Sequence, residues 1–122
     1  MTTKNLYSYE LTAVGETHLE AKVVFNATHP LYRGHFPQAP VTPGVCQMLL
    51  VADLLSEVLQ RPVELEHARD VKFLSMHNPE EDKVLVVKIK FGKQEGEVLA
   101  VNAEILVEQR KVLKLNGSYR IN

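Results

Sequence analysis

The sequence predicts an α+β fold in which an antiparallel β-sheet wraps around one apolar helix. Several segments alternate apolar and polar residues, which is the period of a β-strand with one buried face. A single stretch, residues 43–60, instead places apolar residues at helical spacing. Short turn-forming clusters separate the strand-like segments, which favours antiparallel neighbours. The length suits one hydrophobic core, so we expect a single domain over residues 1–122.

Two strands are expected before the helix, over residues 6–11 and 18–25. Gly15 and Glu16 supply the turn between them. The second segment places its apolar residues on one face: Leu19, Ala21, Val23 and Phe25. This alternation predicts a sheet with one face toward the core.

Residues 29–44 interrupt this regularity and are expected to form an ordered loop. Its chain-breaking residues are Pro30, Gly34, Pro37, Pro40 and Pro43.

The helix should follow this loop directly, with Thr42 as N-cap and Pro43 at the first helical position. We expect it to end near Gln60, before Pro62. Apolar residues cover most of its circumference, which predicts that other structure encloses it.

Four further strands are expected after the helix, with turns at residues 78–82 and 92–96. The first of these strands carries many charges and is expected to be only partly covered. The predicted strands span residues 63–75, 84–91, 98–107 and 112–121.

Charge and composition exclude several classes of protein. The net charge of −1 comes from 14 basic and 15 acidic residues spread along the chain, so we expect no nucleic-acid partner. No apolar stretch is long enough to span a bilayer and the N-terminus lacks a signal core, so we expect a cytoplasmic protein without membrane contact. One cysteine forms no internal disulfide, and the lack of a zinc-type spacing predicts neither a metal nor a cofactor.

The loop and the helix start together carry a specific motif. His35, Phe36 and Pro37 are followed by Pro40 and then Pro43-Gly44, which gives the pattern HFPxxPxxPG. This segment resembles the active-site segment of the 3-hydroxyacyl-acyl-carrier-protein dehydratases, a family with the hotdog fold. The resemblance implies that fold, an acyl thioester substrate on acyl carrier protein or coenzyme A, and dimers with two active sites at the subunit interface.

Histidine suits the chemistry of this family because its ordinary pKa lies near neutrality, so it can take a proton from carbon and return it. The resemblance assigns His35 as the base that removes the C2 proton of the substrate. The alternative is a loop histidine that is bonded to the backbone. Gly44, and with it Val45, is assigned to polarising the thioester carbonyl, since backbone N–H groups at a helix start stabilise developing negative charge.

The resemblance fails at Leu49, where the family carries Glu or Asp fourteen residues after the histidine. Leucine cannot protonate the leaving hydroxyl. Asp53 is the first substitute because it follows one helical turn later on the same face. The alternative for Asp53 is a polar residue at a solvent gap or a dimer contact. We expect the substrate to contact four residues: Phe36, Val45, Gln47 and Leu49.

Three functions follow from these residues. The first is a 3-hydroxyacyl-thioester dehydratase of fatty-acid or related acyl-chain biosynthesis, with an atypical site. The second is a non-catalytic hotdog subunit that binds acyl thioesters, or that completes a composite site with an active homologue. The third is an acyl thioesterase. We expect a homodimer or higher homo-oligomer, or a heterodimer with a related hotdog subunit.

Overall fold

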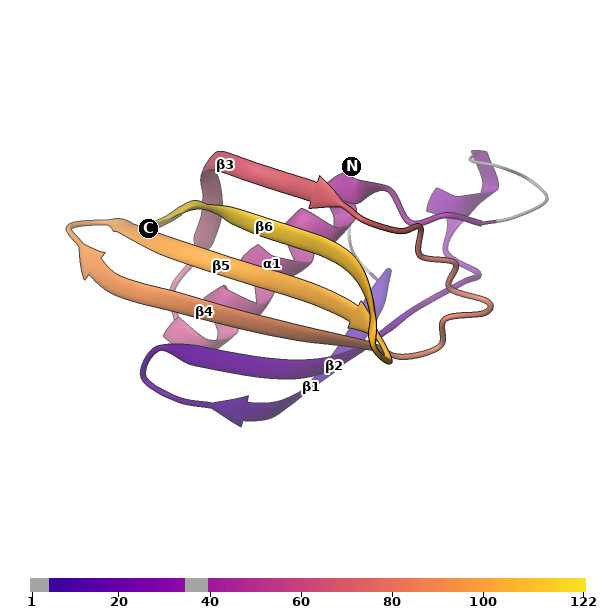
Figure 1. Cartoon of the computed structure of the whole chain (residues 1–122), viewed down its shortest axis with the longest axis horizontal. Helices are drawn as coiled ribbons and strands as arrows, with labels where there is room; N and C mark the ends of the chain where they lie inside the picture. Colours follow the sequence, from indigo (N-terminus) through magenta and orange to yellow (C-terminus); the bar gives the residue numbers. More distant parts are fainter. Residues whose placement is uncertain (1–4, 35–39) are drawn as a thin grey trace.

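A computed structural model describes residues 5–34 and 40–122 of the chain (Figure 1). The described part holds six strands, one α-helix and one short 3-10 helix. In chain order these are β1 (Tyr7–Val14), β2 (His18–Phe25), η1 (Pro30–Gly34), α1 (Gly44–Leu59), β3 (Val63–Phe73), β4 (Leu85–Glu95), β5 (Val98–Val107) and β6 (Arg110–Ile121).

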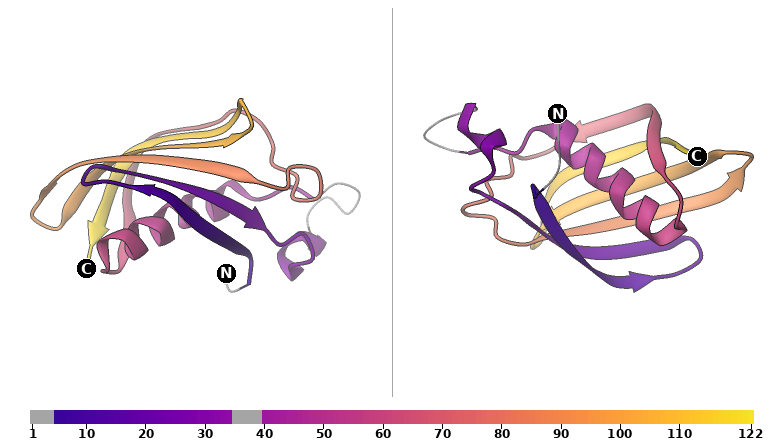
Figure 2. Two further views of the ribbon diagram at one scale, coloured as in Figure 1. Left: turned by 90° about the horizontal axis from the view of Figure 1, so that it is seen from below. Right: turned by 180° about the vertical axis from the view of Figure 1, so that it is seen from behind.

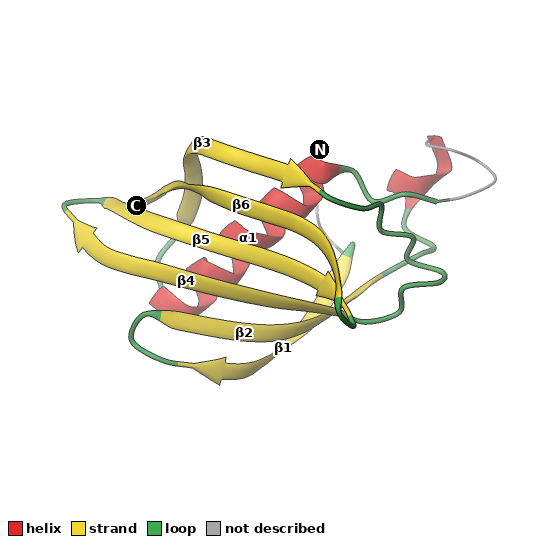
Figure 3. Ribbon diagram, viewed as in Figure 1, coloured by secondary structure: helices red, strands yellow, loops and turns green. Residues whose placement is uncertain are grey.

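The strands form one sheet in the order β1-β2-β4-β5-β6-β3, and every neighbouring pair is antiparallel. The sheet curves, and α1 lies against its concave side (Figure 2). The predicted α+β arrangement of one helix and an antiparallel sheet is therefore confirmed. Figure 3 shows that η1 and the connection between β3 and β4 lie at the same end of the sheet.

The core forms where α1 meets the sheet. Leu50, Val51, Leu54 and Leu55 of the helix are buried. They belong to one apolar cluster with inward-facing strand residues such as Leu19, Val87, Ile105 and Leu115. Full burial of such a side chain stabilises the fold by about 1.5–3 kcal/mol.

The sheet covers only one side of the helix. Val45 and Leu49 keep 48% and 38% of their surface exposed, and Asp53 and Glu57 lie on the same exposed side. The expectation that other structure encloses the helix all round was wrong for the single chain. Apolar residues on both sides of the helix predict that both sides are buried, but the strands of one chain cover only one side.

The start of the helix also differs from the prediction. Pro43, at φ −59° and ψ 141°, is the N-cap and α1 begins one residue later, with no capping side chain among the described residues. The hydroxyl of Thr42, predicted as the cap, instead bonds Tyr32 and His77. The predicted end is confirmed, because Gln60 adopts a left-handed conformation that stops the helix.

Two segments are more regular than predicted. Residues 30–34, which were expected to be irregular, form the 3-10 helix η1. Strand β4 continues through residues 92–95, because a register shift between Phe91 and Gln94 absorbs the irregularity. The reversal then falls at Gly96, whose φ of 63° suits glycine.

Candidate functional site

The start of α1 lies against the end of β3. The ring of Phe73 packs so closely on Gly44 that a Cβ added at this glycine would overlap the ring. Glycine is therefore the residue that lets the ring approach the backbone here. Phe73 itself keeps 55% of its surface exposed, so the ring forms an apolar edge at the helix start.

The helix start can stabilise negative charge. Gly44 and Val45 open α1, where backbone N–H groups point away from the helix and carry the positive end of its dipole. No side chain of residues 5–34 or 40–122 caps this end. A carbonyl oxygen that gains negative charge during a reaction is the kind of group that such amides bind.

Leu49 and Asp53 continue the exposed side of the helix away from Val45. The Tyr7 hydroxyl of β1 donates a hydrogen bond to Oδ2 of Asp53. Burial, followed by the carboxylates of Glu57 and Asp53, raises the pKa of the neighbouring Tyr9. Asp53 therefore lies where β1 crosses the helix, one helical turn beyond Leu49.

Gln47 lies on the opposite, core-facing side of the helix. Only 3% of its surface is exposed, and its Oε1 atom has no hydrogen-bond partner in the described part of the chain. A buried amide oxygen without a donor costs about 1–3 kcal/mol. Gln47 thus offers an acceptor near the helix start, although it does not share the exposed side of Val45 and Leu49.

His35 and Phe36 lie outside the described residues. Of the predicted site residues, the described part brings Gly44, Val45, Gln47 and Leu49 together in the first two turns of α1, with Asp53 one turn further.

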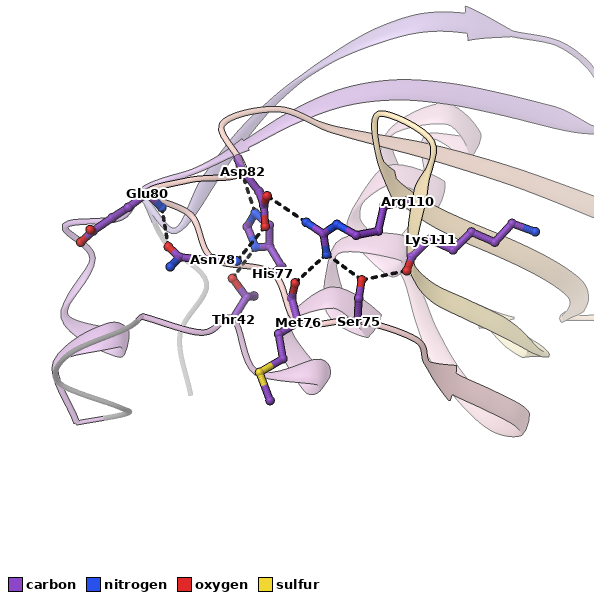
Figure 4. Close-up of polar contacts among 9 residues, drawn as sticks. All are labelled: Thr42, Ser75, Met76, His77, Asn78, Glu80, Asp82, Arg110 and Lys111. Atoms are coloured by element: carbon purple, nitrogen blue, oxygen red, sulfur yellow. Dashed lines mark hydrogen bonds and ion pairs between the residues drawn. The ribbon is translucent and has the colours of Figure 1, made fainter.

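Sequence reasoning missed a buried polar cluster beside the helix start (Figure 4). The Thr42 hydroxyl lies 2.6 Å from Nδ1 of His77 and 2.7 Å from the Tyr32 hydroxyl. The backbone N–H of Thr42 also donates to the His77 carbonyl, at 3.0 Å. The sequence carries no signal for this cluster, because 35 residues separate Thr42 from His77.

An ion pair anchors this cluster to β6. Arg110 lies 2.9 Å from the Asp82 carboxylate and donates to the Ser75 hydroxyl and the Met76 carbonyl. Burial works to raise the pKa of Asp82, but the Asn78 N–H and Arg110 outweigh it and lower that pKa. The connection between β3 and β4 is therefore fixed at several points.

The surroundings of His77 disfavour its protonated form. Burial lowers the pKa of His77; hydrogen bonding to the Asp82 carbonyl and the charge of Asp82 oppose this effect, while Arg110 adds to it. Its ring also contacts Phe25, with the centroids 5.2 Å apart.

Two of the cavities in the described part of the chain bear on where the site lies. One, of about 440 Å³, lies next to the cluster and is lined by residues that include Thr28, His29, Tyr32, Arg33, Pro40 and Glu80. The other, of about 590 Å³, lies on the sheet face that points away from α1, among polar residues such as Lys88, Asn102 and Lys114. Because the helix start lies on the opposite face, we place the candidate site at α1 rather than in the cavity on the outer face of the sheet.

Neither a metal site nor a membrane-spanning segment is found in the described residues. No group of three or more His, Cys, Asp or Glu side chains there is arranged to hold a metal ion. None of the described helices combines the length and the hydropathy that crossing a membrane requires.

A curated relative shares part of this sequence. Over 91 residues the chain is 29% identical to the 3-hydroxyacyl-[acyl-carrier-protein] dehydratase FabZ of Syntrophobacter fumaroxidans. The alignment covers 68% of the chain and 60% of the relative, so the chain spans less than two thirds of that protein's length.

Solved structures share the fold over nearly the whole chain. The dehydratase heterocomplex ApeI:P from Xenorhabdus doucetiae superposes with a TM-score of 0.68 at 21% identity, covering 93% of this chain and 94% of that one. A hypothetical thioesterase with coenzyme A from Streptococcus pneumoniae gives 0.67 at 13% identity, covering 94% and 86%. These likenesses confirm the predicted hotdog fold.

The sequence also matches a protein-family model over most of its length. The model describes the ApeI dehydratase, and the match extends over residues 12–110. That range includes the HFPxxPxxPG motif, the helix, the four strands from β2 to β5 and the end of β1. Because the match covers most of the chain, the protein belongs to the ApeI-like dehydratase family.

Proposed function

We propose that this protein is a dehydratase of 3-hydroxyacyl thioesters in fatty-acid or related acyl-chain biosynthesis. Its substrate is carried on an acyl carrier protein or on coenzyme A, and we place the reaction in the cytoplasm. The observation that carries the proposal is the start of α1 at Gly44, which has no side-chain cap among the described residues and is the last residue of the HFPxxPxxPG motif. Membership of the ApeI-like dehydratase family supports it.

The proposed reaction is an elimination of water. His35 takes the proton from C2, and that electron pair forms the double bond between C2 and C3 as the C3–O bond breaks. The N–H groups of Gly44 and Val45 stabilise the negative charge that builds on the thioester oxygen. Phe36, Gln47 and Leu49 contact the substrate beside these groups.

The leaving hydroxyl needs a proton, and we assign this step to Asp53. Its support is its place on the exposed side of α1, one turn beyond Leu49. The hydrogen bond from Tyr7 to Oδ2 holds the carboxyl group, and in this role its other oxygen, Oδ1, carries the proton that the leaving hydroxyl takes. The two residues can be separated by experiment: Asp53→Asn should lower kcat by roughly 10²-fold or more, as expected for loss of a general acid, whereas Tyr7→Phe should lower it far less. Equal, small effects of both variants would assign Asp53 a structural role.

The second candidate is a subunit that completes a composite site with an active homologue. The exposed Leu49 favours it, because a partner that covers this side of α1 could bring a carboxylate to the place where this chain has none. The ApeI:P neighbour is itself a dehydratase heterocomplex. In this case the isolated chain would be inactive, and activity would appear only with the partner.

We propose that the protein acts as a dimer or larger oligomer through β3 and the exposed side of α1. Strand β3 ends the sheet and pairs only with β6 among the described strands, so its outer edge is open to a further strand. Exposed apolar residues occur on α1, at the end of β3 and just after it: Val45, Leu49, Phe73, Leu74 and Met76.

One experiment tests the function directly. The wild-type chain and His35→Ala are incubated with 3-hydroxyacyl thioesters of increasing chain length, on acyl carrier protein and on coenzyme A, and the products are identified by mass. We expect the unsaturated thioester with the wild type and little or none with His35→Ala. Free carboxylic acid would indicate a thioesterase. The absence of any product from folded protein, alone and with a related hotdog subunit, would refute the proposal.

A further inference from the structure

The polar cluster beside the helix start ties together three segments of the chain. Tyr32 belongs to η1, Thr42 leads into α1, and His77 lies in the connection between β3 and β4. All three residues are buried. Thr42 is at the centre, because both of the other side chains bond its hydroxyl.

The donors and acceptors of this cluster can be assigned. Nε2 of His77 lies 3.1 Å from the backbone carbonyl oxygen of Asp82, which can only accept a hydrogen bond, so Nε2 carries the proton. In a neutral ring Nδ1 then has to accept, and the Thr42 hydroxyl donates to it at 2.6 Å. The Thr42 oxygen in turn accepts from the Tyr32 hydroxyl at 2.7 Å. The chain of donors therefore runs from Tyr32 through Thr42 to His77.

The cluster is fixed from outside by β6. The guanidinium of Arg110 binds the Met76 carbonyl just before His77 and the side-chain carboxylate of Asp82 after it, so the connection that carries His77 is fixed at two points. The backbone N–H of Thr42 adds a second bond to His77 through its carbonyl. Thr42 is thus attached by two hydrogen bonds to a residue that cannot easily move.

Thr42 stands two residues before Gly44, and the described side chains include no cap that fixes the helix start from within. The attachment of Thr42 to His77 therefore sets the place of the first amides of α1. The bond from Tyr32 to Thr42 also joins the two described segments on either side of positions 35–39. A polar group that binds a developing charge loses much of its effect when it is displaced by about 1 Å.

We propose that Thr42 and His77, supported by Tyr32, are positioning residues that hold the amides of Gly44 and Val45 in place for the dehydration. This inference rests on the proposed function. The residues do not touch the substrate; they act through the backbone that does. Their loss should consequently slow the chemical step more than it weakens substrate binding.

The test compares Thr42→Val with Thr42→Ser in the assembly that shows wild-type turnover on 3-hydroxyacyl-coenzyme A. Valine keeps the shape of threonine but removes the hydroxyl, whereas serine keeps the hydroxyl. We expect Thr42→Val to lower kcat by roughly 10- to 100-fold with little change in KM, and Thr42→Ser to stay within a few-fold of wild type. Tyr32→Phe, which removes only the outer donor, should give a smaller loss of the same kind.

Two further measurements separate positioning from folding. Thermal unfolding and circular dichroism check that each variant is folded. If Thr42→Val does not fold, Tyr32→Phe takes its place in the kinetic comparison. Nitrogen-15 NMR of the imidazole should show a protonated Nε2 and an accepting Nδ1 in His77, with the Nδ1 signal displaced in Thr42→Val.

Several results would overturn the inference. These are an unchanged kcat in folded Thr42→Val, a loss that lies entirely in KM, a Thr42→Ser variant as impaired as Thr42→Val, or a protonated Nδ1 in wild-type His77. A wild type without turnover in any assembly would instead refute the proposed function, and this role with it.

Discussion

The ring of Phe73 occupies the space next to Gly44 that any other side chain at position 44 would need. The end of β3 and the start of α1 can therefore pack closely because Gly44 has no Cβ. This contact places an apolar ring beside the amides to which we assign the thioester carbonyl.

Gly44→Ala should displace the Phe73 ring and move the helix start. We expect kcat/KM for a 3-hydroxyacyl thioester to fall at least roughly 10-fold, because the amide donors no longer meet the carbonyl oxygen. Steady-state kinetics of Gly44→Ala, Phe73→Ala and the double variant measure this. If the overlap is the cause, Gly44→Ala should cost less when Phe73 is already absent. Equal costs in both backgrounds would contradict the explanation.

Gly117→Ala should destabilise the fold through the backbone of β3. A Cβ at Gly117 would lie 2.5 Å from the His67 carbonyl oxygen, and this oxygen belongs to a paired strand that cannot easily shift. We expect a loss of about 1–3 kcal/mol in the free energy of unfolding, measured by urea denaturation.

Gly92→Ala is the matched control in the same sheet. A Cβ at Gly92 would lie 3.8 Å from the Cβ of Ala100, which is an ordinary contact. This variant should unfold at the wild-type urea concentration or slightly above it. If Gly117→Ala were as stable as Gly92→Ala, the backbone of β3 would have to shift easily to make room for the added Cβ, and the explanation would be wrong.

Stability should fall on mild acidification because of His77. Burial is the first cause that holds the pKa of this ring below its ordinary value of 6.5. As the pH drops below that value the unfolded chain takes up a proton, while the folded protein does so only at lower pH. The unfolded state then binds more protons, so the free energy of unfolding decreases as the pH falls from about 6.5 toward the lower pKa of the folded protein.

Urea unfolding from neutral pH down to about 5 tests this sign. His77→Gln removes the titrating group, so the free energy of unfolding should differ less between neutral pH and about pH 5 in this variant than in the wild type. The other histidines are present in both proteins. The assignment is wrong if the wild type loses no more stability on acidification than His77→Gln does. The Asp82 carboxylate, whose pKa is lowered, acts in a separate window below its ordinary value of 3.8.

Leu49→Glu should raise dehydratase activity if the acid is what limits this chain. The position is 38% exposed, so a carboxylate can be accommodated without burial of an unpaired charge. We expect kcat to rise by up to roughly 10²-fold, the usual contribution of a general acid. Leu49→Gln has a similar shape but no transferable proton, and it should show no gain. A glutamate variant no better than the glutamine variant would point to an acid supplied by another residue or another subunit.

Local sequence patterns predicted the fold well where one physical effect dominates. The alternation from Leu19 to Phe25 predicted β2, and its apolar residues are buried as expected. The apolar run after Pro43 predicted the helix, and the Arg61-Pro62 pair predicted its end within one residue. Periodicity succeeds in these segments because burial against one sheet decides their structure.

Prediction failed where a distant residue changes the outcome. Threonine is a residue type that often caps helices, but the hydroxyl of Thr42 forms a hydrogen bond with His77, which lies 35 residues later in the chain. Val45 and Leu49 are apolar like the core residues beside them, yet they are exposed. Their exposure could not be predicted, because the sequence does not show which side of the helix the strands of the same chain will cover. The polar cluster around His77 depends on such long-range contacts and was not predicted.

The uncapped start of α1 implies a trade-off between robustness and activity. A capping residue typically contributes about 1 kcal/mol to helix stability, and Pro43 contributes no such bond. A substitution such as Pro43→Asp would strengthen the fold, but its carboxylate would occupy the amides and repel an incoming oxyanion. Selection for heat tolerance would therefore be expected to impair the proposed activity through position 43 before it altered the sheet.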